Sequence, residues 1–175
     1  MEWTLLGFKG LTALFNVHPA FVHFPIALLP ASLLFYFIGI VRKQSSFLFA
    51  GRFCLYLALP AAIITVWTGL DAQDSFPHTQ EIQEMIETHE KIGITVLVIA
   101  FLLVLWSFFR NEKGPRSRFV FLIVMGFASL LVLQNADIGS RMVFLKGAAV
   151  KPFVRVMEKE IHAEQHNQEG THENE

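Results

Sequence analysis

The sequence has one cysteine, Cys54, among its 175 residues. An intrachain disulfide is therefore excluded, and so is covalent c-type haem, which needs a Cys-x-x-Cys-His motif. We interpret Cys54 as a small buried hydrophobic residue. Hydrolase motifs are also missing: there is no Gly-x-Ser-x-Gly, no phosphate-binding loop and no His-Glu-x-x-His. His89-Glu90 begins the last pattern, but Gly93 stands where its second histidine belongs. Nothing in the sequence therefore indicates an enzyme.

Charged residues are scarce. Asp, Glu, Lys and Arg make up 17% of the chain, whereas a soluble domain has about a quarter. The formal net charge is -1, so the chain lacks the basic footprint of a nucleic-acid-binding protein. The first twenty residues have neither the basic start nor the small-residue cleavage site of a signal peptide. We therefore expect no cleaved leader.

Apolar residues make up 53% of the chain and gather in four blocks. Three blocks reach the roughly 18 residues that can cross a bilayer. The fourth is shorter and is extended by snorkelling of Arg118 at one end. We predict an all-α protein, a transmembrane four-helix bundle in contact with the lipid bilayer, which forms one domain over residues 18–157. The predicted helices cover residues 20–41, 47–70, 79–110 and 118–137, each to within a few residues.

The segments on either side of this domain differ from it. Residues 1–17 alternate apolar and polar side chains, which is typical of a short helix lying in the membrane interface. Residues 158–175 are acidic and rich in glutamine, and we predict a disordered polar tail there. Its histidines are best interpreted as solvated. They are His162, His166 and His172.

Basic residues mark two of the three connections between the blocks. Arg42, Lys43 and Arg52 lie near the first connection, and four more basic residues lie between positions 110 and 118. The middle connection carries six acids against Lys91 alone. The positive-inside rule then predicts a multi-pass membrane protein, with both basic connections in the cytoplasm and both termini on the outer side. Basic residues after the fourth block favour the opposite orientation.

In this topology, three histidines lie near the outer ends of the helices. His18 and His23 stand where the first apolar run begins, and His89 lies on the apolar face of the third helix. Imidazole is costly to place against hydrocarbon, and it binds metals and haem iron well. We expect His18 to cap its helix at the surface and His23 to lie deeper. The sequence therefore predicts a pairing of His23 with His89.

The segment that contains the first two histidines reads His18-Pro19-Ala20-Phe21-Val22-His23-Phe24-Pro25-Ile26-Ala27-Leu28-Leu29. It closely resembles the opening motif of the DUF2231 family, uncharacterised bacterial membrane proteins with four helices. The resemblance covers roughly residues 16–150. It includes Thr68-Gly69-Leu70-Asp71 at the end of the second helix, His89 at the start of the third, and a turn over residues 139–144 after the fourth.

Members of that family often occur joined to redox proteins such as cytochromes, or beside them. The resemblance therefore implies haem binding or electron transfer by association, with such proteins as partners. Many members carry a His-Gly pair where this chain has Lys146-Gly147. If that histidine is a ligand in the family, this chain lacks it.

The first hypothesis for the site is haem b. His23 and His89 would hold the iron from facing helices, since a helix bundle can enclose a planar apolar ligand between two imidazoles. Gly93 would leave room for something bulky, and Asp71 or Asp137 would orient a histidine through its second nitrogen.

Two alternatives remain open at this level. In one, His18, His23, His89 and Asp71 hold a non-haem metal, because they form a plausible set of nitrogen and oxygen ligands. In the other, the histidines are structural and cap helix ends. The protein would then be a scaffold or subunit of a larger membrane complex.

Overall fold

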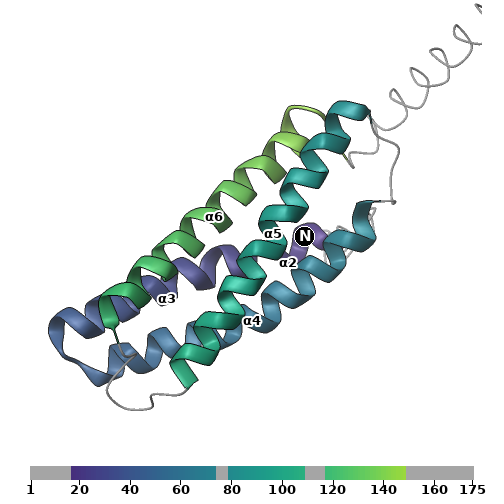
Figure 1. Ribbon diagram of the computed structural model, residues 1–175. Coiled ribbons are helices and arrows are strands. Elements are labelled where there is room, and N and C mark those ends of the chain that lie inside the picture. The colour runs from purple at the N-terminus through teal and green to yellow at the C-terminus, as the bar shows by residue number, and fades with distance from the viewer. Residues whose placement is uncertain (1–16, 74–78, 109–116, 149–175) are drawn as a thin grey trace, which may run out of the picture.

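The computed structural model describes residues 17–73, 79–108 and 117–148. The predicted interfacial helix over 1–17, except Val17, and the predicted tail over 158–175 lie outside the described residues. In the described ranges the chain forms helices whose order is α2 (His18–Phe21), α3 (His23–Arg42), α4 (Ser45–Ala72), α5 (Gln80–Phe108) and α6 (Arg118–Phe144). Figure 1 shows the four long helices running side by side.

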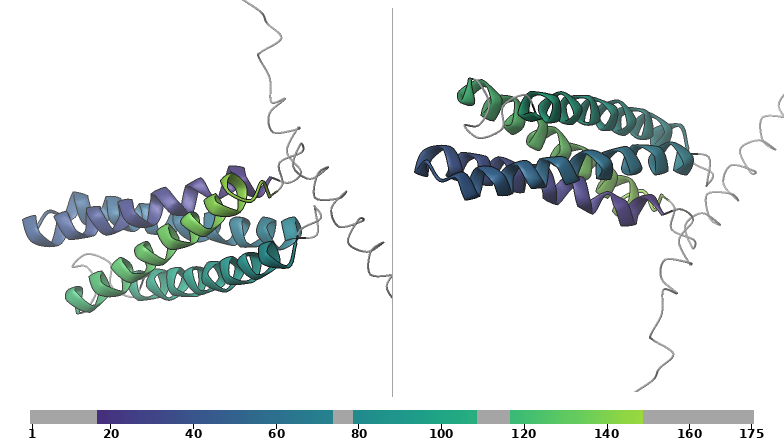
Figure 2. Two further views of the ribbon diagram at one scale, coloured as in Figure 1. Left: turned by 90° about the horizontal axis from the view of Figure 1, so that it is seen from above. Right: turned by 90° about the horizontal axis from the view of Figure 1, so that it is seen from below.

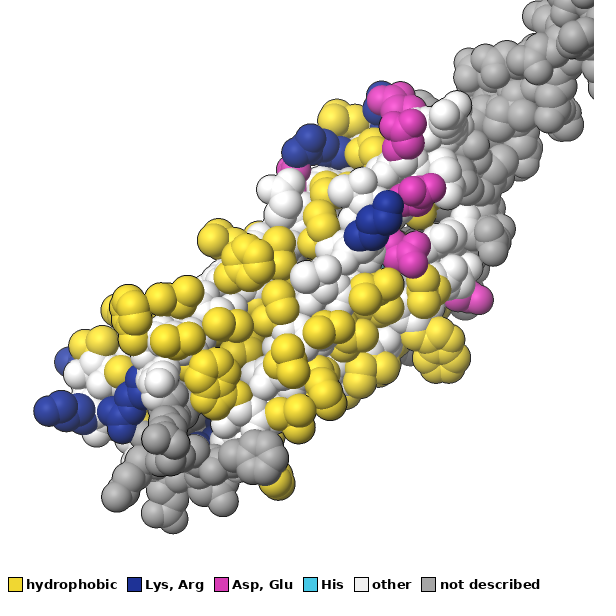
Figure 3. All heavy atoms as spheres, in the orientation of Figure 1, with side chains coloured by type: hydrophobic (Ala, Val, Ile, Leu, Met, Phe, Trp, Pro, Cys, Tyr) yellow, Lys and Arg dark blue, Asp and Glu magenta, His cyan; other side chains and the backbone are white. Residues whose placement is uncertain are grey.

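The predicted transmembrane four-helix bundle is confirmed. Each long helix, with α2 and α3 counted as one span, has between 25 and 29 residues and is apolar enough to cross a membrane, for which about 20 residues suffice. Figure 3 shows a broad apolar belt between a basic end and an end where acidic side chains gather. Large apolar side chains are exposed on every long helix, among them Phe37, Phe53, Leu102 and Leu130.

The four long helices form a ring in which each contacts two neighbours. α3 packs against α4 and α6, and α5 packs against the same two helices. Figure 2 shows this arrangement from two further sides, with the turn between α3 and α4 at the end away from α2. Lys43 makes that turn with a left-handed φ of 55°. Gly39 allows the close approach of the two helices, since a β-carbon there would lie 2.8 Å from the backbone nitrogen of Leu48.

Each long helix buries a stripe of residues spaced by four, three and four positions. This spacing keeps one narrow face of a helix against its neighbours over three turns, as in other antiparallel bundles. The stripes of α3 and α5 start at Pro25 and Val96, and those of α4 and α6 start at Gly51 and Phe121. The hairpin of α3 and α4 and the hairpin of α5 and α6 are therefore structural repeats that run in the same direction.

Near the basic end, a large buried side chain on one helix of each hairpin is matched by a small residue on the other helix. Tyr36 is fully buried against Gly51, where a β-carbon would lie 2.9 Å from its ring. At the matching positions of the second hairpin the small residue is Ser107 and the large one is Phe121. The hydroxyls of Tyr36 and Ser107 are 2.7 Å apart and form a hydrogen bond across the bundle. This bond satisfies two polar groups that would be costly to bury alone.

Pro25 explains how the chain enters α3. Proline has no N–H, so the carbonyl of Phe21 lacks the helical hydrogen bond it would otherwise accept. The hydroxyl of Thr65 in α4 donates to that carbonyl at 3.2 Å. The break between α2 and α3 is thereby joined to α4, and α2 packs against α4.

α6 is longer than predicted. We expected the fourth helix to end near residue 137 and residues 139–144 to form a turn, but α6 continues to Phe144. Asp137 and Arg141 form an ion pair one helical turn apart, with Arg141 Nε 2.8 Å from the carboxylate, which supports the last turns. Gly139 lies within this continued part of α6, and the ring of His89 packs against it.

Candidate functional site

The three histidines of the described residues lie at one end of the bundle, which we call the histidine end. His18 begins α2, His23 begins α3, and His89 lies in α5 about two turns after its start. The acidic residues of the described ranges also lie toward this end, and the opposite, basic end carries Arg42, Lys43 and Arg118.

His18 is anchored on α4. Its Nδ1 lies 3.0 Å from the main-chain carbonyl oxygen of Thr65, and the hydroxyl of Thr68 lies 3.4 Å away. A β-carbon at Gly69, one turn after Thr65, would lie 3.0 Å from Cε1 of the ring. The imidazole thus fits against α4 only because position 69 has no side chain.

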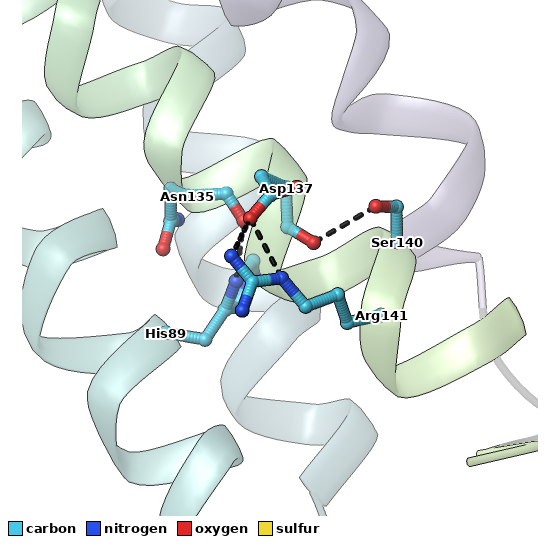
Figure 4. A network of polar contacts seen from close by, with 5 residues as sticks. All are labelled: His89, Asn135, Asp137, Ser140 and Arg141. Atoms are coloured by element: carbon cyan, nitrogen blue, oxygen red, sulfur yellow. Dashed lines mark hydrogen bonds and ion pairs between the residues drawn. The ribbon is translucent and has the colours of Figure 1, made fainter. Parts of the chain in front are cut away.

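His89 is anchored on α6 in the same manner. Its Nδ1 lies 3.0 Å from the main-chain carbonyl oxygen of Asn135. A β-carbon at Gly139, one turn after Asn135, would lie 3.2 Å from Cε1 of the ring. Figure 4 shows His89 reaching from α5 to that carbonyl, with Asp137, Ser140 and Arg141 further along α6.

These anchors determine the tautomer of both rings. A carbonyl oxygen only accepts hydrogen bonds, so each Nδ1 must carry the proton and donate it. The lone pair of each neutral imidazole then lies on Nε2, the nitrogen that would bind a metal. Metal-binding histidines are commonly held by a hydrogen bond of this kind.

The two anchored rings are neighbours. The ring centroids of His18 and His89 are 6.1 Å apart, and the ring planes are nearly perpendicular at 86°. His18 comes from the first hairpin and His89 from the second, at corresponding places. The pair therefore lies where the two structural repeats meet.

The repeat is imperfect beside the rings. The hydroxyl of Thr65 donates to the carbonyl of Phe21, which lacks a helical hydrogen bond because residue 25 is proline. In α5 the position that corresponds to Pro25 is Val96, whose N–H can donate, so no carbonyl there lacks its helical partner. Asn135 occupies the place that corresponds to Thr65, and its side-chain Oδ1 is buried with no hydrogen bond to any described residue. An unsatisfied buried acceptor typically costs about 1–3 kcal/mol.

A cavity of about 480 Å³ opens beside the pair. Side chains from all five described helices line it, and the lining is predominantly apolar. His18, His23 and His89 all contribute to the wall, as do Gly93 and Asn135. Its volume falls within the range of about 300–1,000 Å³ that is usual for ligand pockets. We call it the histidine cavity.

The ring beside His89 is that of His18, not that of His23 as the sequence suggested. His18 is partly buried and lies beside His89, whereas His23 is exposed and reaches only the cavity wall. The reason is helical periodicity: Val22 keeps helical φ and ψ of -57° and -29°, so His18 falls on the same helix face as the buried Pro25, whereas His23 lies on another face. The described contacts therefore pair His89 with His18 and not with His23.

The expected carboxylate partners of the histidines are replaced by main-chain carbonyls. Asp71 is exposed at the end of α4, and Asp137 forms an ion pair with Arg141. Both carbonyls lie inside their helices, and the second lone pair of each oxygen can accept the imidazole N–H without the cost of burying a charge. Gln73 and Glu90 form a further hydrogen bond of 2.8 Å at the rim.

Within the described ranges, no three His, Cys, Asp or Glu side chains gather as a metal site would require. The four-residue set of His18, His23, His89 and Asp71 therefore stays a prediction, and two histidines are the part that the fold brings together. Gly93 has an ordinary environment: a β-carbon would lie 3.4 Å from the side-chain nitrogen of Asn135.

The comparison with protein families bears on this site. A family model described as a predicted membrane protein (DUF2231) matches residues 14–152. The chain belongs to the DUF2231 family. The membership inferred from the sequence motifs is thus confirmed, and the description agrees with four membrane-crossing helices. The matched range of this DUF2231 chain includes the histidine cavity and both histidine anchors. Comparisons with curated proteins and with solved structures found no match.

Sequence reasoning missed the anchors of the two rings. The sequence nevertheless carries a pattern that could have indicated them. A polar residue is followed by a glycine one helical turn later near the end of the second helix, at Thr65 and Gly69, and of the fourth helix, at Asn135 and Gly139. Glycine is unfavourable inside a helix, so its recurrence one turn after a polar residue indicated close packing. The contributions of the carbonyls themselves could not be read from residue types.

Proposed function

We propose that this protein binds haem b in the histidine cavity, with His18 and His89 as the two ligands of the iron, and acts in electron transfer. The observation that carries the proposal is the pair of neighbouring imidazoles, each with Nδ1 held by a carbonyl. When bound, haem would supply reversible one-electron chemistry at its iron.

The spacing of the rings is compatible with a shared iron. The ring centroids of His18 and His89 are 6.1 Å apart, and a metal–imidazole bond is about 2.0 Å, so the two side chains are close enough that both would hold one iron. The apolar lining suits the faces of a porphyrin.

The proposal includes an orientation. Because Arg42, Lys43 and Arg118 lie at the basic end, the positive-inside rule supports a cytoplasmic position for that end. The histidine cavity would then face the outer side of a bacterial inner membrane, with both termini on that side. Redox proteins such as cytochromes would be the electron partners there.

One observation favours a second candidate function. The bonds from His18 to Thr65 and from His89 to Asn135 join α2 to α4 and α5 to α6. Histidines that only fasten helices would suit a structural subunit or scaffold of a membrane complex. A metal other than haem iron would use the same two imidazoles.

The deciding experiment compares haem retention among variants of the purified protein. The wild type, produced with ample haem, should show a reduced-minus-oxidised spectrum typical of two histidine ligands. His18→Gln and His89→Gln should each lose it, since glutamine keeps the size and hydrogen bonding of the side chain but binds iron poorly. His23→Gln is the matched control and should keep it, because His23 lies in the wall but outside the pair.

A wild-type protein without a haem band would refute the haem proposal. Metal analysis of the same samples would then separate the remaining candidates. A metal present in the wild type and absent from His89→Gln indicates a non-haem site. Loss of thermal stability in both glutamine variants, with no bound metal in any sample, indicates the structural role.

A further inference from the structure

The chain folds back over the histidine end directly after α6. Gly147 has a left-handed φ of 66°, which ends the helix as glycine often does. The backbone N–H of Ala148 donates to the carbonyl of Met142 at 2.9 Å, and that of Gly147 donates to Val143 at 3.1 Å. We call residues 145–148 the strap.

The strap packs on the part of α5 that precedes His89. Ala148 is only 4% exposed, because it lies in a small apolar cluster with Ile82, Ile86 and Met142 that is separate from the main core. Lys146 Nζ also lies 2.6 Å from a carboxylate oxygen of Glu81, near the start of α5. Ala148, Met142 and Ile86 are at the same time part of the wall of the histidine cavity.

The strap is bound to α6 by backbone hydrogen bonds, but its contacts with α5 are weak. One alanine methyl buries little apolar surface, and the ion pair is surface-exposed, with side chains 37% and 64% accessible. Exposed ion pairs of this kind contribute little and are weakened further by salt. By contrast, α4 and α6 are joined to the main core through buried residues such as Leu55 and Met125. The strap is therefore the part of the wall that can open at the smallest cost.

We propose that the strap gates the aqueous entrance to the histidine cavity, with the Lys146–Glu81 ion pair as its releasable contact. Opening would expose Ile86 and the cavity beyond it to water without any change in the four long helices. The inference rests on the proposed function only for the identity of the occupant, because the gate controls access whatever the cavity holds.

The test measures water access to the cavity without haem. A reporter cysteine replaces Ala136, which lines the cavity, in a Cys54→Ala background. The labelling rate is followed with a charged, membrane-impermeant methanethiosulfonate. Lys146→Glu and Glu81→Lys should each raise the rate about threefold, as expected for loss of a surface ion pair. The double charge swap should restore the parental rate, because the pair forms again with reversed signs.

Lys91 and Glu87 provide the matched control. The Lys91 Nζ atom lies 3.5 Å from a carboxylate oxygen of Glu87 in an exposed ion pair. Both residues are in α5, like Glu81, but lie away from the strap. Lys91→Glu changes the charge of the molecule as Lys146→Glu does, yet it should leave the labelling rate unchanged.

Three results would contradict the proposed gate. They are equal labelling rates in all variants, a rise in the labelling rate with Lys91→Glu equal to that with Lys146→Glu, or a labelling rate that stays high in the double charge swap. A reporter that never reacts would also overturn it, since access would then come from the bilayer side. Haem is absent throughout, so failure of the gate and failure of haem binding are distinguishable.

Discussion

Gly139 lies against the imidazole of His89, so that a β-carbon there would come within 3.2 Å of Cε1 of the ring. Gly69 has the same relationship to His18, at 3.0 Å. In both cases the glycine follows the residue whose carbonyl anchors the ring by one helical turn. The position of each imidazole thus depends on the lack of a side chain on the neighbouring helix.

Alanine at either glycine should weaken haem binding. Gly69→Ala or Gly139→Ala forces the ring away from its rotamer, which costs about 0.5–1.5 kcal/mol. We expect haem affinity, measured by titration of the purified protein in detergent, to fall roughly three- to tenfold. Gly126→Ala is the control, because nothing lies within 4 Å of a β-carbon there. An equal loss of affinity in Gly126→Ala would contradict the explanation.

The Tyr36–Ser107 hydrogen bond should be measurable as a coupling energy. Hydrogen bonds between membrane helices average about 0.6 kcal/mol and reach about 1.7 kcal/mol. A double-mutant cycle of Tyr36→Phe and Ser107→Ala, followed by unfolding in mixed detergent, should return a value in that range. Additive effects of the two substitutions would show that the bond contributes nothing to stability.

The corresponding residues Thr65 and Asn135 should respond in opposite directions. Thr65→Val removes the hydroxyl that satisfies the Phe21 carbonyl, and we expect a loss of about 1 kcal/mol in the free energy of unfolding. Asn135→Leu removes a buried acceptor without a partner among the described residues, so it should be neutral or stabilising by up to about 1 kcal/mol.

The anchor of His89 is the main-chain carbonyl of Asn135, so Asn135→Leu should also keep its haem. Thermal unfolding and the haem spectrum of the same preparations check both statements. Equal destabilisation by the two substitutions would mean that the asymmetry between the hairpins has no energetic consequence.

The proposed orientation is testable in intact cells. In a Cys54→Ala background, a membrane-impermeant maleimide should label Glu84→Cys from outside and should label Lys43→Cys only after the membrane is broken. Both positions are exposed, so accessibility on the protein itself does not limit the reaction. The reverse labelling pattern would show that the bundle has the opposite orientation, with the histidine cavity on the cytoplasmic side.

Much of the fold was predictable because it depends on properties of single segments. Hydrocarbon admits no unsatisfied backbone, so four long apolar runs must become four helices. The fourth helix was the exception. The run of apolar residues ends near Gln134, but Asp137, Arg141 and the packing of Gly139 continue the helix in a polar environment, which hydropathy does not report.

The site was only partly predictable because it depends on contacts between segments. Three histidines at one end were evident from the order of residues along the chain. Their roles were not, since the packing of α2 against α4 and the space beside Gly69 bring His18 rather than His23 to His89. The anchoring groups are main-chain carbonyls, which every residue has and no sequence pattern marks.

The sequence by itself determined that this is a four-helix membrane protein of the DUF2231 family with its histidines at one end. Apolar length and the distribution of charge are local quantities, and they decide where a chain crosses a bilayer. Only the tertiary structure decided that the two hairpins repeat one another, that His18 and His89 meet between them, and that the strap closes over the cavity. Those relationships arise from side-chain size and hydrogen bonding across helices, where one glycine or one freed carbonyl determines which ring lies inside.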